Sequence, residues 1–407
     1  MLSLAIPFLF VGIGWAAPVQ ENQEAIWAVL VAGSKGYWNY RHQSDISAAY
    51  QLLIQRGVPK SQIITMMNPH RGKLYNWPGG PDVYAGVEVD YRLQDVNLGN
   101  LKAVLLGDAG NITGNGTGRV LKSNKQSHLF FYFTDHGAFE ALQLPTGELI
   151  MENEFTKLMK EMMDREMFGS AMVFLEACES GSMVENWGTF NNVFAATAAS
   201  ATEPSYATHC LDFVLDTCMA DEFSYNWMDT ARRLSPKESL EGLTILTKAK
   251  TKRSNVQEIG SLQMKTRSNG AYLGSHVSKT LAQLDYKNYT AQATQPTWKI
   301  PLIQLERRAA SGDIKHVQNL RIFTQKLSKL EHVLEKLKHD LPISSHFKLS
   351  SNNFDKNCYG EALQEFINRC SDRDIDSFAL RNARIFASAC AHQETAAILK
   401  ILESSCP

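Results

Sequence analysis

The sequence has no excess of charge of either sign. Its 41 Lys and Arg residues are balanced by 42 Asp and Glu residues, which leaves a formal net charge of −1. Binding to nucleic acid needs a clear basic excess, so nucleic acid is not an expected partner. The chain also lacks a long apolar run after its first seventeen residues. No membrane span is therefore expected, and 407 residues are enough for two domains.

Residues 1–17 form a short apolar run that ends in the small residues Ala16 and Ala17. The run lacks an initial Lys or Arg, but it is too short to cross a bilayer comfortably, and polar residues follow it at once. We therefore predict a signal peptide, rather than a buried strand, and entry into the secretory pathway. Three glycosylation sequons support that route, and they begin at Asn111, Asn115 and Asn288.

The number of cysteines is odd, at seven. In a secreted chain most cysteines pair, and one left over indicates a free reactive thiol. Cys210 and Cys218 can close a short loop, and four others lie close enough at the end of the chain for two bridges in a small domain: Cys358, Cys370, Cys390 and Cys406. Spacing alone leaves the pairing open, because six cysteines allow many arrangements.

Short apolar runs alternate with helical patterns over most of the chain. Such runs indicate a mostly parallel sheet that is covered on both faces by helices. We predict a three-layer α/β/α domain over residues 18–285. Its expected strands lie at 26–32, 62–67, 129–134, 172–177 and 193–197, with a helix that includes 47–54.

The remaining sequence divides into two parts. Residues 286–312 contain prolines and show no clear period, so we predict a linker. Residues 313–407 are predicted to be all-helical, because leucines recur at spacings of three and four up to Leu341, just before Pro342. This long helix is expected to pack in a small bundle. Further helices are expected at 359–369, 378–389 and 393–402, and the four late cysteines would crosslink them.

Two strand ends carry the residues of greatest chemical interest. His136 follows the strand at 129–134, and Cys178 follows the strand at 172–177. Reactive groups of α/β domains lie just beyond the carboxyl ends of such strands. A thiol beside an imidazole favours nucleophilic catalysis, and the N–H groups of Gly137 and Cys178 are candidate donors to a developing oxyanion.

Several motifs resemble those of legumain, the asparaginyl endopeptidase family of the caspase-like cysteine peptidases. The resemblance covers the whole chain, including its last four cysteines. The matching segments are Val31–Asp45, which contains Asn39-Tyr-Arg41-His42, and Asp82–Val87, Asp90–Tyr91, Phe131–Gly137, Glu176–Ser182 and Ser224–Trp227.

The resemblance implies a caspase-like sandwich, the catalytic pair His136 and Cys178, and an Asn39 that orients the histidine. It also implies a pocket for the residue before the scissile bond, formed by Arg41, His42, Glu176, Ser205, Tyr206 and Asp221. In such a pocket Arg41 can donate to the oxygen of an asparagine side chain, while the two carboxylates accept from its nitrogen. Aspartate would be accepted mainly when protonated, so its cleavage is expected only at acid pH.

The resemblance further implies that residues 313–407 are a prodomain that covers the active site and leaves at acid pH. Residues 301–350 contain nine Lys or Arg and five Asp or Glu, and protonation of histidines in this segment would add positive charge: His316, His332, His339 and His346. The expected partners are protein and peptide substrates, the prodomain itself as inhibitor, and cystatin-like inhibitors, with no metal or other cofactor. The expected location is a lysosome, endosome or vacuole, or outside the cell.

The chain departs from the family pattern in two places. Pro204 precedes Ser205 and Tyr206 where the family often has serine, and proline has no donor. Residues 305–313 contain no Asn at which the chain could cleave itself. Candidate cleavage points are therefore Asn288, Asn319, Asp313 or the Arg307–Arg308 pair.

Three alternative functions are compatible with these motifs. A peptide asparaginyl ligase would use the same residues and would differ in how water reaches the thioester. A catalytic subunit of a GPI-anchor transamidase would carry a carboxyl-terminal membrane helix, which this sequence lacks. A catalytically silent binding protein on this scaffold would have no use for an intact His136, Cys178 and charged pocket.

Overall fold

The computed structural model describes residues 25–210, 215–276, 294–343 and 353–406. The predicted signal peptide, Asn288 and His346 lie outside the described residues. A central sheet of six strands has the order β11-β8-β7-β3-β1-β2, and it is parallel except for β11 at its edge. The strands are β1 (Ile26–Ala32), β2 (Ile63–Met66), β3 (His128–Thr134), β7 (Ser170–Glu176), β8 (Val193–Thr197) and β11 (Gln257–Ile259).

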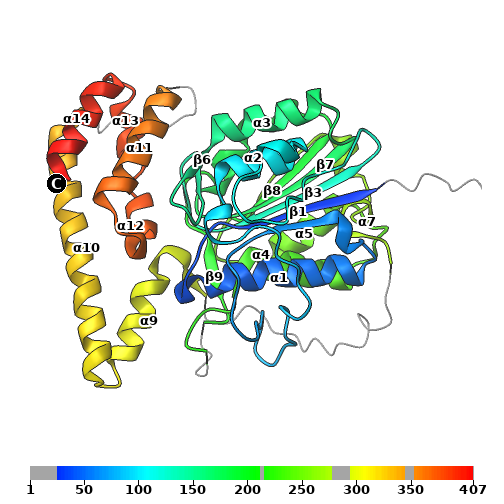
Figure 1. Cartoon of the computed structure of the whole chain (residues 1–407), viewed down its shortest axis with the longest axis horizontal. Coiled ribbons are helices and arrows are strands. Elements are labelled where there is room, and N and C mark those ends of the chain that lie inside the picture. Colours follow the sequence, from blue (N-terminus) through cyan, green and yellow to red (C-terminus); the bar gives the residue numbers. More distant parts are fainter. Residues whose placement is uncertain (1–24, 211–214, 277–293, 344–352, 407) are drawn as a thin grey trace, which may run out of the picture.

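Helices cover both faces of this sheet, which makes the predicted three-layer α/β/α sandwich (Figure 1). One face carries α1 (Tyr40–Gln55), α4 (Glu222–Arg233) and α5 (Leu240–Lys250), and the other carries α2 (Leu98–Leu106) and α3 (Glu152–Asp164). Residues of β3 are buried on both sides, as expected for a strand in the middle of a parallel sheet. The short helices α6 (Leu262–Lys265) and α7 (Gly270–Leu273) complete this domain.

The carboxyl ends of the parallel strands all point toward the helical domain (Figure 1). Two small antiparallel sheets frame this edge. One consists of β4 (Gly137–Ala138), β5 (Ala141–Gln143) and β6 (Leu149–Met151). The other consists of β9 (Tyr206–Thr208), β10 (Ala220–Asp221) and β12 (Gln295–Pro296).

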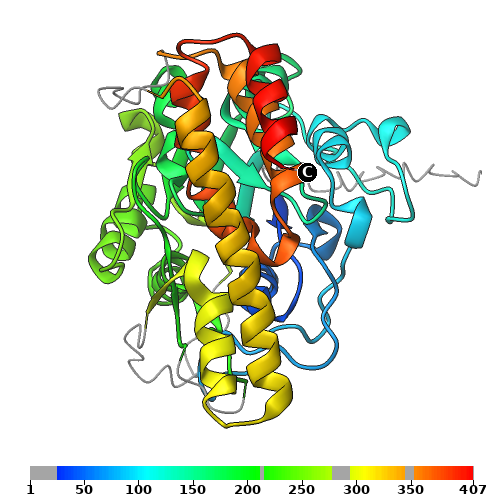
Figure 2. The ribbon, with the colours of Figure 1, turned by 90° about the vertical axis from the view of Figure 1, so that its left-hand side faces the viewer.

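The helical domain stands across this edge as a separate layer (Figure 2). It contains α10 (Ile314–Asp340), α11 (Lys356–Cys370), α12 (Asp376–Leu380), α13 (Arg384–Ala389) and α14 (Thr395–Ser405). Its apolar cluster continues into β4, β5 and β6 of the first domain. The disulfides Cys358–Cys390 and Cys370–Cys406 crosslink its helices, and Cys210–Cys218 closes the loop between β9 and β10.

Two details differ from the sequence predictions. The predicted helix at 378–389 is interrupted after Leu380, where the Asn382 side chain donates to the Phe378 carbonyl and so competes with helical bonding. The predicted linker is structured where it is described: β12 is followed by η7 (Thr297–Lys299) and α9 (Ile300–Ala309). Its Pro301 lies in the first turn of α9, where proline costs no hydrogen bond.

Within the described part of the chain, no helix is both long enough and apolar enough to span a membrane.

Candidate active site

His136 and Cys178 lie just beyond the ends of β3 and β7, which are neighbours in the sheet. The two segments touch at Gly137: a Cβ added there would lie 2.7 Å from the carbonyl oxygen of Cys178 and 2.9 Å from the Cβ of Ala177. Only glycine permits this approach. The two strand ends that the sequence singles out are therefore packed against each other.

The two ring nitrogens of His136 have different surroundings. Nε2 lies 2.9 Å from Oδ1 of Asn39, which is the last residue of η1 (Tyr37–Asn39). The Asn39 amide nitrogen donates to the Lys35 carbonyl, so its oxygen faces the ring and Nε2 carries the proton. Nδ1 is buried and has no hydrogen-bond partner among the described residues, so it is the nitrogen able to accept a proton.

Both members of the pair are held neutral in this closed structure. Burial, with a smaller effect of Arg41, lowers the pKa of His136 to about 3. Burial raises the pKa of the Cys178 thiol, although hydrogen bonds from Thr297 and Ser205 oppose the shift. The Cys178 sulfur lies 3.1 Å from Oγ1 of Thr297 and 3.9 Å from Oγ of Ser205. Thr297 comes from the segment between the two domains.

A fully buried ion pair adjoins Asn39 and belongs to the residues predicted to bind the substrate side chain, which we call the pocket. Nε of Arg41, in α1, lies 2.7 Å from Oδ1 of Asp221, which ends β10. Nη1 of the same guanidinium donates to the Trp38 carbonyl at 2.9 Å. The Asp221 backbone N–H donates to Asp45, which fixes β10 against α1. Nη2 of Arg41 is buried without a hydrogen-bond partner among the described residues.

Glu176, the last residue of β7, supplies an acceptor to the same pocket. Its Oε2 accepts from both the backbone N–H and the hydroxyl of Ser224, each at 3.0 Å. Its Oε1 is buried and has no hydrogen-bond partner among the described residues. Burial and the nearby Asp221 carboxylate raise the pKa of Glu176 well above its usual range. Arg41 Nη2 and Glu176 Oε1 are thus a buried donor and a buried acceptor that have no hydrogen-bond partner in the described part of the chain.

His42 packs edge to face against the His136 ring, with the ring centroids 5.4 Å apart. The His42 ring nitrogens are 3.2 and 3.3 Å from carboxylate oxygens of Asp135 and Asp221. Burial and the charge of Arg41 lower the pKa of His42 well below its usual value, so the imidazole is neutral. Its position suits a role in fixing these two carboxylates.

Ser205 and Tyr206 lie at the start of β9, beside Cys178. Ser205 is buried and its carbonyl accepts from the Thr297 backbone N–H at 3.2 Å, while Tyr206 pairs with Pro296 of β12. Pro204, the departure from the family pattern, precedes this strand, and the adjacent Glu203 accepts from Ser200 and Asn255. The missing donor of Pro204 therefore does not interrupt the pairing of β9 with β12.

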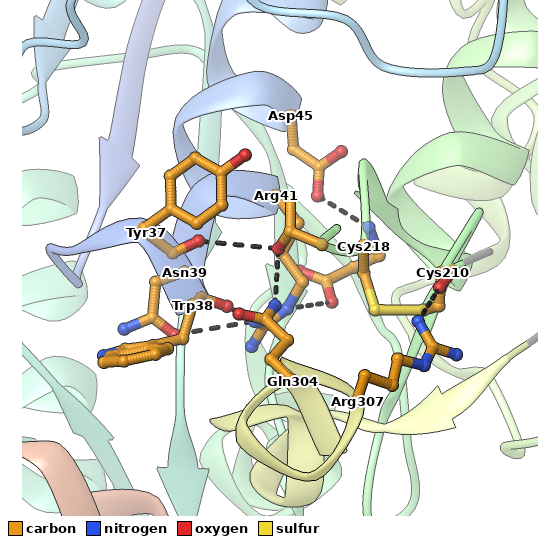
Figure 3. Close-up of a disulfide and its surroundings, with 11 residues drawn as sticks. Tyr37, Trp38, Asn39, Arg41, Asp45, Cys210, Cys218, Gln304 and Arg307 are labelled. Carbon is orange, nitrogen blue, oxygen red and sulfur yellow. Dashed lines mark hydrogen bonds and ion pairs between the residues drawn. A yellow bond between two sulfur atoms is a disulfide. The ribbon is translucent and has the colours of Figure 1, made fainter. Parts of the chain in front are cut away.

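Two residues that the sequence did not single out complete the site. Besides Thr297, α9 places Gln304 at the pocket, and Figure 3 shows its carboxamide pointing toward Arg41. Gln304 is buried, its nitrogen donates to Thr217 at 2.6 Å, and its oxygen has no hydrogen-bond partner among the described residues. The only sequence signal for either residue is its place in the predicted linker.

The helical domain closes the site from the other side. Arg384 lies 3.2 Å from a carboxylate oxygen of Glu179, the residue after Cys178. Asp376 accepts from Gln143 at 2.9 Å, and Arg373 donates to the Pro145 carbonyl at 2.7 Å. His136 shares a small cavity with Asp376, so the imidazole is covered by the helical domain.

The remaining predicted residues lie away from this pocket. Asn111 and Asn115 are exposed, in the region between α2 and β3. His332 and His339 are exposed on α10, and His316 is partly exposed. This helix packs mainly on α9, α14 and the short η8 (Arg373–Ile375).

A thiol and an imidazole on neighbouring strand ends of an α/β/α sandwich, with buried charged side chains close by, define a cysteine peptidase. The family model described as "Peptidase C13 family" matches residues 26–275. The chain belongs to this family of cysteine endopeptidases.

Relatives cover nearly the whole chain. Legumain of Mus musculus is 34% identical over 412 residues, which span 96% of this chain and 94% of the mouse protein. Legumain of Homo sapiens is 32% identical, with 94% of each chain covered. The "Vacuolar-processing enzyme delta-isozyme" of Arabidopsis thaliana is 33% identical over 75% of this chain and 71% of the plant protein.

Proposed function

We propose that this protein cleaves peptide bonds after asparagine, and after aspartate at acid pH, with Cys178 as nucleophile. One observation carries the specificity. Arg41 Nη2 and Glu176 Oε1 are a donor and an acceptor, both buried and both without a hydrogen-bond partner among the described residues. An asparagine side chain offers the complementary acceptor and donor. A side chain that left these groups unpaired would be rejected, because buried unpaired polar groups are costly.

The proposed reaction assigns one step to each group. Nδ1 of His136 takes the proton of the Cys178 thiol, while Asn39 holds the ring through Nε2. The thiolate attacks the carbonyl carbon, and the N–H groups of Gly137 and Cys178 stabilise the oxyanion. Collapse forms a thioester and releases the amine, which receives the proton from His136. Water then attacks the thioester. This step releases the carboxylic acid product and restores the Cys178 thiol.

The segment between the domains supports a latent form that inhibits itself. β12 pairs antiparallel with β9, Thr297 contacts the Cys178 sulfur, and the Gln304 carboxamide points at the pocket as a substrate asparagine would (Figure 3). A peptide substrate would need the same strand edge and the same pocket. We infer that residues 295–309 and the helical domain must move before substrate binds, and that the helical domain is the prodomain.

The pKa of His136 gives a physical reason for activation at acid pH. In the closed form it is about 3, chiefly because of burial, whereas an exposed histidine titrates near 6.5. The open form therefore takes up a proton that the closed form does not, so acid favours opening. Glu179 and Asp376, whose pKa values burial raises, act in the opposite direction. The location that fits is a lysosome or vacuole reached through the secretory pathway.

The turn between α9 and α10 is the proposed site of activation cleavage. Residues 310–313 are exposed, and Asp313 begins α10 as its cap. By contrast, Arg307 and Arg308 belong to α9, and their side chains contact the loop closed by Cys210–Cys218. Cleavage after Asp313 would need a protonated aspartate, which fits self-processing at acid pH.

The test is a set of fluorogenic peptides that differ only in Asn, Asp, Arg or Lys before the scissile bond, assayed after acid incubation. We expect Asn turnover at pH 5–6, Asp turnover only below that range, and loss of both in Cys178→Ala. Asn turnover that survives in Cys178→Ala, or a preference for Arg or Lys, would overturn the proposal. Mass measurement of the incubated chain locates the cleavage point, and an added amine nucleophile reveals ligation.

A further inference from the structure

The loop closed by Cys210–Cys218 holds α9 on the catalytic domain through three side chains, of which Figure 3 shows Gln304 and Arg307. Gln304 donates to Thr217, and Arg307 donates to the Cys210 carbonyl. Arg308 lies 2.6 Å from a carboxylate oxygen of Asp216. The first contact lies next to the specificity pocket, whereas Arg308 lies one helical turn further along α9.

The Arg308 guanidinium contacts the Tyr37 ring as well as the Asp216 carboxylate. The guanidinium lies 5.6 Å from the centre of the Tyr37 ring, and the Tyr37 hydroxyl donates to the Leu215 carbonyl. An aromatic face and a carboxylate are the two groups that bind a guanidinium best in water. Tyr37 belongs to η1, which also contains Asn39. The Tyr37 ring therefore has a fixed position relative to the catalytic histidine.

The direction of β9 indicates which part of a bound substrate would lie near Asp216 and Tyr37. Along β12, Gln295 pairs with Ala207, Pro296 pairs with Tyr206, and Thr297 reaches Ser205 and Cys178. A chain that binds in this way approaches Cys178 from the end of β9 that leads into the disulfide loop. Residues on the amino-terminal side of a scissile bond would therefore pass the loop.

We propose that Asp216 and Tyr37 form a basic subsite, which binds an Arg or Lys side chain of the substrate on the amino-terminal side of the scissile bond. The proposal rests on the proposed function, because α9 must leave before substrate can enter. Arg308 fills the basic subsite in the closed chain. Once α9 leaves, the Asp216 carboxylate and the Tyr37 ring keep their place on the catalytic domain and accept a substrate cation instead.

The test compares peptides that differ in one charge. Each peptide carries Asn before the scissile bond and a single Arg at one of the four preceding positions, and its partner peptide carries neutral citrulline there. For the acid-activated protein we expect kcat/KM to be about threefold to tenfold higher for Arg than for citrulline at one of these positions, as a half-exposed ion pair with an aromatic contact allows. The ratio should fall as salt is added.

The Asp216→Asn variant keeps the side-chain shape and removes the charge. Asp216 has a φ of 47°, a left-handed conformation that Asn also adopts readily, so the loop should fold unchanged. We expect its Arg-to-citrulline ratio to fall to about one, with turnover of the citrulline peptides kept. Asp108→Asn is the matched control, because Asp108 has the same side-chain exposure of 31% and also pairs with an arginine, Arg165.

Each outcome decides between the two proposals. Asn turnover with no Arg preference in the unmodified chain, or an Arg preference that survives in Asp216→Asn, would overturn the basic subsite alone. Absence of Asn turnover for every peptide would overturn the proposed function and the basic subsite with it.

Discussion

At the scale of single residues, the two ring nitrogens of His136 separate orientation from chemistry. Nε2 is occupied by Asn39, and Nδ1 is left for proton transfer. The proposed role of Asn39 is thus positional: it fixes the tautomer and the plane of the ring. Such a role predicts a loss of rate with little change in substrate affinity.

We expect Asn39→Ala to lower kcat of the acid-activated protein by about tenfold to a hundredfold, because a misplaced base reacts poorly. KM should change little, as measured with an Asn peptide. Asn186→Ala, an exposed asparagine in η6 (Glu185–Thr189), serves as control. A raised KM at unchanged kcat would contradict the positional role and would point to the pocket through Arg41, which lies 3.5 Å away.

Gly137→Ala should be the most damaging small change in the site. The added methyl would meet the Cys178 carbonyl oxygen at 2.7 Å, so the two strand ends must separate. We expect unfolding to become easier by about 1–3 kcal/mol and kcat/KM to fall sharply, as measured by thermal unfolding and peptide turnover. Gly188→Ala, where nothing lies within 4 Å, should change neither quantity, and equal effects of both variants would refute this explanation.

At the scale of elements, α9 is the part whose contacts keep the pocket occupied. It binds the disulfide loop through Gln304, Arg307 and Arg308, and it packs on α10. The Trp298 ring before it contacts Phe378 and lies under Arg381, which ties the same segment to α12 and its following turn. Release of α9 therefore requires contacts with both domains to break.

We expect Gln304→Ala to weaken the closed form by about 1 kcal/mol, because one buried hydrogen bond is lost and the pocket is left open. Labelling of Cys178 by a thiol reagent at pH 7 should become about fivefold faster in the full-length chain. The control is Gln318→Ala, on the exposed side of α10. An unchanged labelling rate would mean that Gln304 does not hold α9 closed.

At the scale of the whole molecule, the closed form is coupled to pH through the groups that both domains bury. His136 has a pKa of about 3 when closed, and an ordinary value near 6.5 is expected when open. A group with a lowered pKa stabilises the closed form above the open-form value and loses that contribution as pH falls. The relevant window therefore runs from about pH 6.5 down to pH 3.

As the pH falls through that window, we expect the equilibrium constant for opening to rise by up to about tenfold per pH unit. The opening equilibrium is measured by hydrogen-exchange protection of residues 295–309, after correction for the intrinsic pH dependence of exchange. His136→Gln should flatten the dependence, whereas Glu179→Gln should steepen it, because the raised pKa of Glu179 opposes opening at acid pH. The same steepness in His136→Gln as in the unmodified chain would exclude His136 as the group responsible.

The sequence predicted the catalytic domain well because its core strands are short, continuous apolar runs. The runs at 26–32 and 193–197 coincide with β1 and β8, and the strands that His136 and Cys178 follow are neighbours in the sheet. These features are local: a buried strand needs apolar residues throughout, and the residue after its end is fixed in place by the strand itself.

The helix and strand within the predicted linker could not be predicted from the sequence, for the opposite reason. Residues 295–309 show no period because their order depends on what they touch: Thr297 meets Cys178, and Gln304 meets Thr217. Protonation of histidines was predicted to add positive charge to the helical domain, and the structure places His332 and His339 on an exposed face of α10. The group expected to respond to acid is His136, because burial in the closed form lowers its pKa.

The sequence by itself determined the chemistry that this protein has available, namely a free thiol, an imidazole and a set of charged residues on known strands and helices. Only the tertiary structure decided which of those groups remain unpaired. Among the described residues, Arg41 Nη2 and Glu176 Oε1 are buried without hydrogen-bond partners, and the loop closed by Cys210–Cys218 places Asp216 against Arg308. Such pairings join residues distant in the chain, so they depend on how the elements pack and not on any local pattern.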